Sequence, residues 1–126
     1  MATQKNKILI IDDDPFLLIM YSKKFLAEGF IVNGVQTAAE GLAEAKNIRP
    51  DIILLDVMLP DEDGISLLKK LKRQKETAST PVILLSNISE QPHREQARVY
   101  GAAAYYVKAC LEPAEIVDKV KKLLVS

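Results

Sequence analysis

Short runs of apolar residues alternate with longer amphipathic segments along the whole chain. Runs of strand length occur at five places, namely Lys7–Ile11, Ile31–Val35, Ile52–Leu55, Val82–Leu85 and Ala104–Val107. The first, third and fourth runs are almost continuously aliphatic, which is typical of strands buried on both faces of a parallel sheet. The second run is interrupted by Asn33 and Gly34. This interruption favours an edge strand.

Segments with helical spacing fill the gaps between these runs. The expected helices are Pro15–Glu28, a helix opening at Thr37, Ile65–Lys75, Ser89–Tyr100 and Ala114–Val125. Pro15 suits a first helical turn, Gly29 suits a helix stop, and Thr37 with Glu40 forms a capping box. Alternating strands and helices, with right-handed connections, indicate an α/β fold. The pattern therefore predicts a (βα)5 doubly wound five-stranded parallel sheet in a three-layer sandwich.

Length and charge limit the classes of partner. The 126 residues fit one domain (1–126, with a core of about 6–125), and we expect no output domain in this chain. Lysine plus arginine equals aspartate plus glutamate, 17 each, which disfavours direct binding of nucleic acid or an anionic membrane. Cys110 is the single cysteine, so no internal disulfide is expected. The first seven residues are polar and no long apolar stretch is present, so we expect a cytoplasmic location.

Carboxylates gather where two of the expected strands end. Asp12, Asp13 and Asp14 follow the first strand, and Asp56 follows the third. The carboxyl ends of parallel strands meet in the crevice where open α/β sheets bind ligands. At ~4 Å and an effective dielectric constant near 20, each carboxylate pair costs roughly 4 kcal/mol, so a cation is needed. Oxygen ligands favour Mg²⁺, whereas Asp14, directly before Pro15, is expected to cap the first helix.

The fourth and fifth strands end on different chemistry. Ser86 follows the fourth strand, and Lys108 follows the fifth. Together with the acids, the crevice would hold a metal, a nucleophilic carboxylate, a hydroxyl and an ammonium group. Metal and ammonium charges neutralise phosphoryl oxygens, and a hydroxyl donates a hydrogen bond to them. The set therefore predicts a site for phosphoryl transfer.

The chain resembles the receiver domain of two-component response regulators over essentially its whole length. Four segments carry the resemblance, namely Ile8–Pro15 (ILIIDDDP), Asp51–Gly64 (DIILLDVMLPDEDG), Pro81–Ser86 (PVILLS) and Gly101–Lys108 (GAAAYYVK). Each segment is weak alone, but the four together, in order and at this spacing, are specific. The resemblance implies a flavodoxin-like strand order 2-1-3-4-5.

The resemblance also implies the roles of the acids. Asp56 would be the phosphoacceptor, and Asp12 and Asp13 the acidic pair. The Mg²⁺ ligands would be Asp12, Asp13 and Asp56 with the backbone carbonyl of Met58. Of the acidic pair, Asp13 would be the one that contacts Mg²⁺ directly.

Three further residues match the switch of this family. Ser86 would report phosphorylation by rearranging, Lys108 would pair with the phosphoryl group, and Tyr105 would swing between outward and inward rotamers. The donor would be a histidine kinase or histidine phosphotransfer protein, and the output a downstream protein target. The chain itself would be a phosphoacceptor and not a turnover enzyme, either as a monomer or as a weak homodimer through the face of the last helix.

Two positions depart from the family pattern. Ala109 stands where a proline with a cis peptide bond is usual, and a non-proline cis bond costs roughly 2.5–4 kcal/mol, which puts the reach of Lys108 in question. Asn87 stands where a small residue is usual and would crowd or hydrogen-bond the phosphoryl group. They favour an alternative, a degenerate receiver that acts as a phosphorylation-independent interaction scaffold. A third hypothesis is an enzyme on the same fold, although Met58 replaces the second aspartate that a dehalogenase-type phosphatase needs.

The first expected helix carries more apolar residues than a packed face needs. Leu17, Tyr21 and Phe25 form one apolar stripe, yet every residue of the run 16–20 is apolar. We expect Leu18 and Ile19 to face outward and to form a contact patch for the phosphodonor.

Overall fold

The computed structural model describes residues 5–87 and 91–125 of the chain. Its strands are β1 (Lys7–Ile11), β2 (Ile31–Val35), β3 (Ile52–Asp56), β4 (Val82–Ser86) and β5 (Ala104–Val107). They form one parallel sheet in the order β2-β1-β3-β4-β5. The predicted strand order and the predicted edge position of the second strand are therefore confirmed. β3 and β4 each run one residue further than predicted, so that Asp56 and Ser86 belong to the sheet itself.

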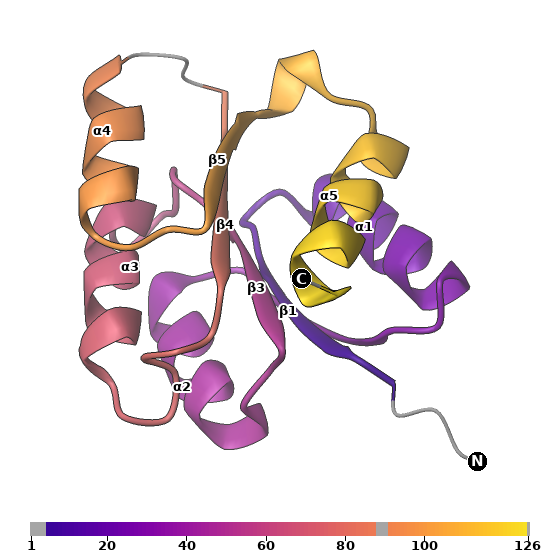
Figure 1. Cartoon of the computed structure of the whole chain (residues 1–126), viewed down its shortest axis with the longest axis horizontal. Coiled ribbons are helices and arrows are strands. Elements are labelled where there is room, and N and C mark those ends of the chain that lie inside the picture. The colour runs from indigo at the N-terminus through magenta and orange to yellow at the C-terminus, as the bar shows by residue number, and fades with distance from the viewer. Residues whose placement is uncertain (1–4, 88–90, 126) are drawn as a thin grey trace.

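Helices cover both faces of this sheet. They are α1 (Pro15–Ala27), α2 (Ala38–Ile48), α3 (Gly64–Arg73), α4 (Gln91–Val99) and α5 (Pro113–Val125), with a short 3-10 turn over Lys108–Cys110. Figure 1 shows α1 and α5 on one face and α2, α3 and α4 on the other. The three-layer sandwich is confirmed. The predicted start of the fourth helix at Ser89 lies outside the described residues.

Each face of the sheet has its own hydrophobic core. Alternate residues of β1 serve the two sides, because successive side chains of a strand point to opposite faces: Leu9 packs toward α2 and α3, whereas Ile8 packs toward α1 and α5. On the second side the rings of Phe25 and Phe30 meet edge to face, with centroids 5.1 Å apart. Fully burying one such aliphatic or aromatic side chain contributes about 1.5–3 kcal/mol.

The packing of α1 differs from the prediction at Leu18. Leu18 packs against the core shared with α5, and a Cβ atom at Gly34 would lie only 2.8 Å from Leu18 Cδ1. The prediction that Leu18 faces outward is therefore wrong, because the missing side chain at Gly34 leaves room for it. Ile19 is exposed as predicted, and Phe16 is 81% exposed.

Side-chain caps fix where the helices begin. Asp14 caps α1 as predicted, its Oδ1 accepting from the backbone N–H groups of Phe16 (2.9 Å) and Leu17 (3.3 Å). Asp63 caps α3 by accepting from the Ser66 N–H at 3.0 Å, so this helix begins at Gly64 and not at Ile65. Among the described residues no helix is long and apolar enough to cross a membrane.

Candidate functional site

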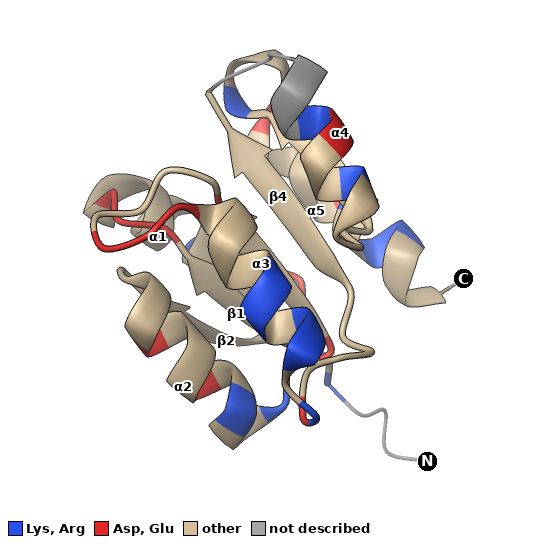
Figure 2. Ribbon diagram, turned by 90° about the vertical axis from the view of Figure 1, so that its left-hand side faces the viewer, with Lys and Arg blue, Asp and Glu red and all other residues tan. Residues whose placement is uncertain are grey.

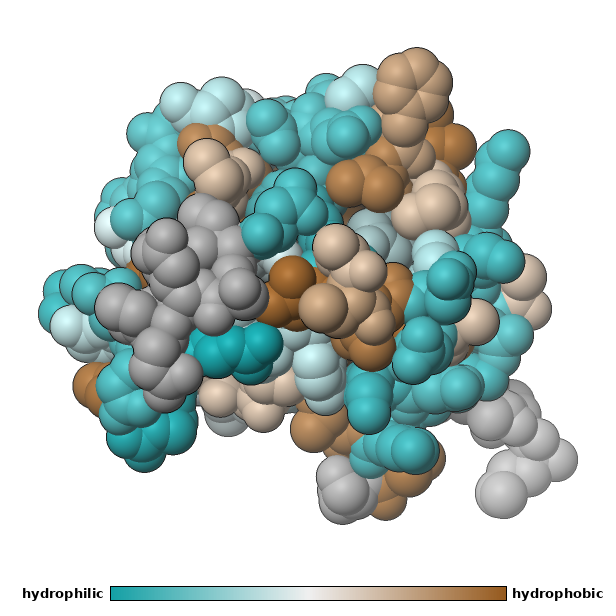
Figure 3. All heavy atoms as spheres, turned by 90° about the horizontal axis from the view of Figure 1, so that it is seen from above, coloured by the Kyte–Doolittle hydropathy of each residue, from teal (hydrophilic) through white to brown (hydrophobic). Residues whose placement is uncertain are grey.

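Four polar residues lie at one edge of the sheet. Asp12 directly follows β1, Asp56 ends β3, Ser86 ends β4 and Lys108 directly follows β5. Because all five strands are parallel, these positions lie at the same edge, the upper one in Figure 1. Seen from above, that edge shows hydrophilic side chains interspersed with apolar ones (Figure 3). The residues predicted from separate strand ends are thus brought together.

The three predicted carboxylates form a tight cluster. Asp12, Asp13 and Asp56 each offer an oxygen, and these oxygens all lie within 4.8 Å of one another. Asp12 is 2% exposed and Asp56 8% exposed, whereas Asp13 lies on the surface. Met58 follows Asp56 by two residues, and its N–H donates to Asp56 Oδ1 at 3.2 Å. This all-oxygen donor set, open to solvent on the Asp13 side, fits a hard divalent cation such as Mg²⁺.

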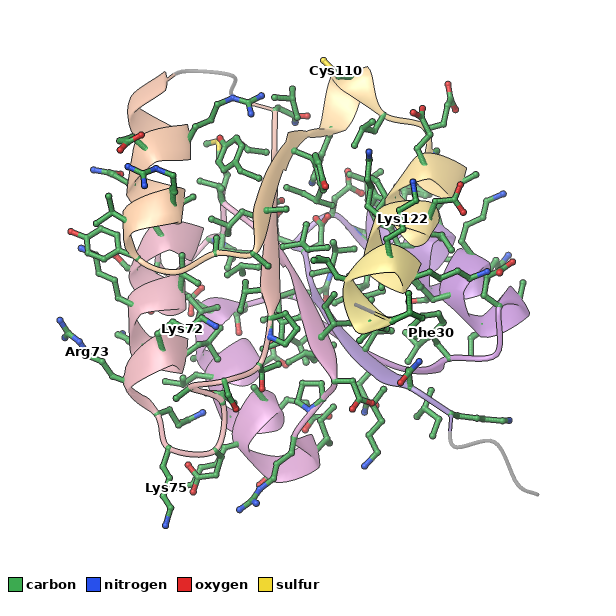
Figure 4. The ribbon with its side chains drawn as sticks, viewed as in Figure 1. Phe30, Lys72, Arg73, Lys75, Cys110 and Lys122 are labelled. Carbon is green, nitrogen blue, oxygen red and sulfur yellow. The ribbon has the colours of Figure 1, made fainter. Side chains whose placement is uncertain are left out.

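Lys108 reaches into the acidic cluster. Its Nζ lies 3.0 Å from Asp12 Oδ2 and 3.0 Å from Asp56 Oδ2, with little of the three side chains exposed. No peptide bond among the described residues is cis, so the bond from Lys108 to Ala109 is trans. The absence of proline after Lys108 therefore does not prevent its ammonium group from reaching Asp12 and Asp56. The exposed thiol of Cys110 points outward from the short 3-10 turn (Figure 4).

Burial and charge act in opposite directions on these groups. Burial raises the pKa of Asp56, and neighbouring Asp12 adds to the shift, whereas Lys108 and the Met58 N–H oppose it. Burial alone would lower the pKa of Lys108, but its hydrogen bonds to and the charges of Asp12 and Asp56 outweigh burial and raise that pKa. The lysine therefore stays charged at neutral pH, while an ionised Asp56 is held at an energetic cost.

The two predicted switch residues lie on adjacent strands. Ser86 is fully buried at the end of β4, in register with Val107 of β5. Tyr105 is half-buried, and the guanidinium carbon of Arg94, on α4, lies 5.2 Å from its ring centroid. No sequence signal pointed to Arg94. Asn87 is exposed, and its predicted effect on a phosphoryl group stays a prediction.

Three further residues shape the site without having been predicted to do so. A Cβ atom at Gly64 would lie 2.5 Å from the backbone oxygen of Asp56, so only glycine fits there. Tyr21, expected only as core, is buried near the charged cluster: burial raises the pKa of its hydroxyl, Lys108 opposes the shift, and Asp12 and Asp56 add to it. The third, Asp61, binds the start of α2.

Comparisons with known proteins agree with this geometry. The family model described as "Response regulator receiver domain" matches residues 8–121. The transcriptional activator protein IrlR of Burkholderia pseudomallei is 38% identical over 119 residues, which cover 94% of this chain and 50% of that protein. The chain therefore spans about half the length of this curated relative.

Solved structures match almost the whole chain. A CheY-like response regulator receiver domain protein from Methanospirillum hungatei is 30% identical with a TM-score of 0.90, the match covering 96% of this chain and 94% of that one. The BeF3-activated N-terminal receiver domain of RstA from Klebsiella pneumoniae is 25% identical with a TM-score of 0.87, over 96% and 100% of the two chains.

Proposed function

This chain belongs to the response regulator receiver domains of two-component systems, and we propose that it accepts a phosphoryl group on Asp56. The observation that carries the proposal is the position of Lys108, whose Nζ lies 3.0 Å from oxygens of both Asp12 and Asp56. A carboxylate with a fixed cation beside it can take on the dianionic charge of a phosphoryl group without leaving that charge unpaired.

The transfer is a substitution at phosphorus. A carboxylate oxygen of Asp56 forms the new O–P bond as the N–P bond of a donor phosphohistidine breaks, and the electron pair of that bond returns to the imidazole. Lys108 neutralises the incoming phosphoryl oxygens, and the buried hydroxyl of Ser86, at the end of the adjacent strand, can donate to one of them. The transferred group stays on Asp56 until water hydrolyses the acyl phosphate, so in this role the chain is itself the phosphoacceptor and does not convert a separate substrate.

Asp12, Asp13, Asp56 and the carbonyl of Met58 would hold Mg²⁺ in this reaction. When bound, the metal would supply positive charge that neutralises the phosphoryl oxygens and so helps to orient the phosphoryl group for attack by Asp56. The chain's own contribution is to keep three carboxylates within 4.8 Å of one another despite their repulsion. Met58 lies close by because its N–H is bonded to Asp56.

Phosphorylation would then change a surface that a downstream protein reads. Ser86 and Tyr105 lie on neighbouring strands, and Tyr105 contacts Arg94 of α4, so movement at Ser86 can reach that helix. The donor would be a histidine kinase or a histidine phosphotransfer protein. The alternative, a scaffold that is never phosphorylated, rested on Ala109 and Asn87, but the reach of Lys108 removes the first of these reasons.

Beryllofluoride tests the proposal because it adds to a carboxylate as an acyl phosphate analogue. In ¹⁹F NMR, we expect the wild-type chain to give a protein-bound BeF₃⁻ signal only with Mg²⁺ present, and Asp56→Asn to give none. A signal of equal intensity from Asp56→Asn, or from wild type with the metal chelated, would refute the proposed acceptor or its metal dependence.

A further inference from the structure

The side chain of Asp61 ties the loop between β3 and α3 to the start of α2. Its Oδ1 accepts from the Ala38 N–H at 2.9 Å, and its Oδ2 accepts from the Ala39 N–H at 3.0 Å. In Figure 2 the acidic loop that leads into α3 lies at the upper end of α2. One carboxylate thus joins two elements whose bonded residues are 22 and 23 positions apart in the chain.

These two bonds complete the cap of α2. The first backbone N–H groups of a helix have no partner within the helix. Thr37 satisfies only the third, accepting from the Glu40 N–H at 3.1 Å. Asp61 takes the other two, and its charge suits the positive end of the helix dipole. The N–H of Ala38 and then that of Ala39 hold the pKa of Asp61 below its ordinary value, so the carboxylate is ionised at neutral pH.

The same loop carries Met58, whose carbonyl we assigned to Mg²⁺. The ends of the loop are fixed near the sheet: the Met58 N–H donates to Asp56, and the Gly64 N–H donates to Val57 O at 2.6 Å. The Met58 side chain is 59% exposed, and the Met58 backbone pairs with that of Asp63 in an isolated antiparallel bridge, which leaves residues 59–62 as the middle part of the loop. The Asp61 carboxylate adds a fixed point in this middle part, and it is anchored to a helix outside the site.

We infer that Asp61 is a positioning residue for the metal site, because its bonds to the first turn of α2 hold the loop in the conformation that presents the Met58 carbonyl. The inference rests on the proposed function. It predicts that removing the carboxylate loosens the loop and weakens Mg²⁺ binding, although Asp61 is not itself a ligand. Residues that orient metal ligands commonly change affinity by about 10–100-fold, and one backbone ligand among several carboxylates should contribute less, about three- to tenfold.

The test compares Asp61→Ala with two matched controls by isothermal titration of Mg²⁺ into metal-free protein. Thr37→Ala removes the other cap of α2 and leaves the loop tied. Glu62→Gln removes one negative charge from the same loop and leaves the bonds to α2 intact. At an ionic strength of about 0.15 M, where charges are screened over about 8 Å, we expect only Asp61→Ala to raise the Kd for Mg²⁺ about three- to tenfold.

Amide hydrogen exchange in metal-free protein gives a second readout. The Ala38, Ala39 and Met58 amides should exchange faster in Asp61→Ala than in wild type, whereas the Met58 amide should be unchanged in Thr37→Ala. An unchanged Kd in Asp61→Ala, or an equal loss of affinity in either control, would overturn the inference about Asp61 and leave the proposed function standing. If wild type binds no Mg²⁺, the proposed metal site fails and the inference fails with it.

Discussion

At the scale of single residues, Asp56 combines burial with a neighbouring negative charge. Its pKa is raised by burial and by Asp12, even though Lys108 opposes the shift. A carboxyl whose pKa is raised on folding stabilises the folded state in its protonated form. That contribution is fully present below the ordinary value of 3.8 and is lost as the pH rises through the folded pKa. An ionised Asp56 therefore lowers the free energy of unfolding at neutral pH.

Asp56→Asn should for this reason melt at a higher temperature than wild type at pH 7 in the absence of divalent metal. The difference should shrink as the pH falls toward and below 3.8, where the wild-type carboxyl is protonated in both states. Added Mg²⁺ should reverse the order, since metal at 100 times its Kd stabilises wild type by about 2.7 kcal/mol. Melting curves across pH, with and without Mg²⁺, check this, and a lower Tm for metal-free Asp56→Asn at pH 7 would show that its pairing with Lys108 dominates.

Gly64 is the other residue on which the position of Asp56 depends. Gly64→Ala would place a Cβ 2.5 Å from Asp56 O and 2.8 Å from Val57 Cα, both backbone atoms that cannot rotate away. We expect Gly64→Ala to lower the free energy of unfolding, measured by urea denaturation, by about 1–3 kcal/mol. The variant should also bind Mg²⁺ more weakly.

Gly29→Ala is the matched control for this substitution. Gly29 has a φ of +89° and open space around its Cβ position, so alanine there is strained without touching the site. Gly29→Ala should lower the free energy of unfolding by about 1–2 kcal/mol and leave the Kd for Mg²⁺ unchanged. If Gly64→Ala binds Mg²⁺ as tightly as wild type, the close approach of Gly64 does not position Asp56.

At the scale of elements, α1 shows where sequence reasoning reaches its limit. The run 16–20 is apolar at every position, so periodicity alone could not fix which side of the helix faces the sheet. The deciding feature is Gly34 on β2, which leaves room for Leu18, and Leu18, Tyr21 and Phe25 then share one face. The bonds of Asp61 to α2 were missed for a similar reason, since they depend on how two elements pack and not on either segment alone.

Three large apolar side chains of α1 are exposed, namely Phe16 (81%), Ile19 (54%) and Leu26 (56%), and the first two form the exposed pair of the run 16–20. We expect Phe16→Ser/Ile19→Ser to slow phosphotransfer from a cognate kinase about five- to tenfold, because truncating an apolar side chain that packs in such an interface costs about 1 kcal/mol. The Tm and labelling by acetyl phosphate should stay unchanged. Leu18→Ser, in contrast, should lower the Tm, because it places a hydroxyl in the core. Loss of acetyl phosphate labelling in the double variant would indicate damage to the site and not to docking.

At the scale of the whole molecule, topology explains why most of the site could be predicted. Each of Asp12, Asp56, Ser86 and Lys108 stands at a strand end, and a parallel sheet brings all such ends to one edge. Apolar runs locate strand ends well, so the residues that follow them could be named. Arg94, on α4, contacts the Tyr105 ring, and Gly64, the first residue of α3, lies against the backbone of Asp56. Neither residue stands at a strand end, so the apolar runs did not point to them.

Intact mass spectrometry after treatment with acetyl phosphate tests the central claim most directly. The wild-type chain with Mg²⁺ should gain the mass of one phosphoryl group, and the gain should disappear when the metal is chelated. Asp56→Asn should gain none under the same conditions, because the amide cannot form the acyl phosphate. A phosphoryl group that maps to Ser86, or full labelling of Asp56→Asn, would contradict the assignment of Asp56 as the acceptor.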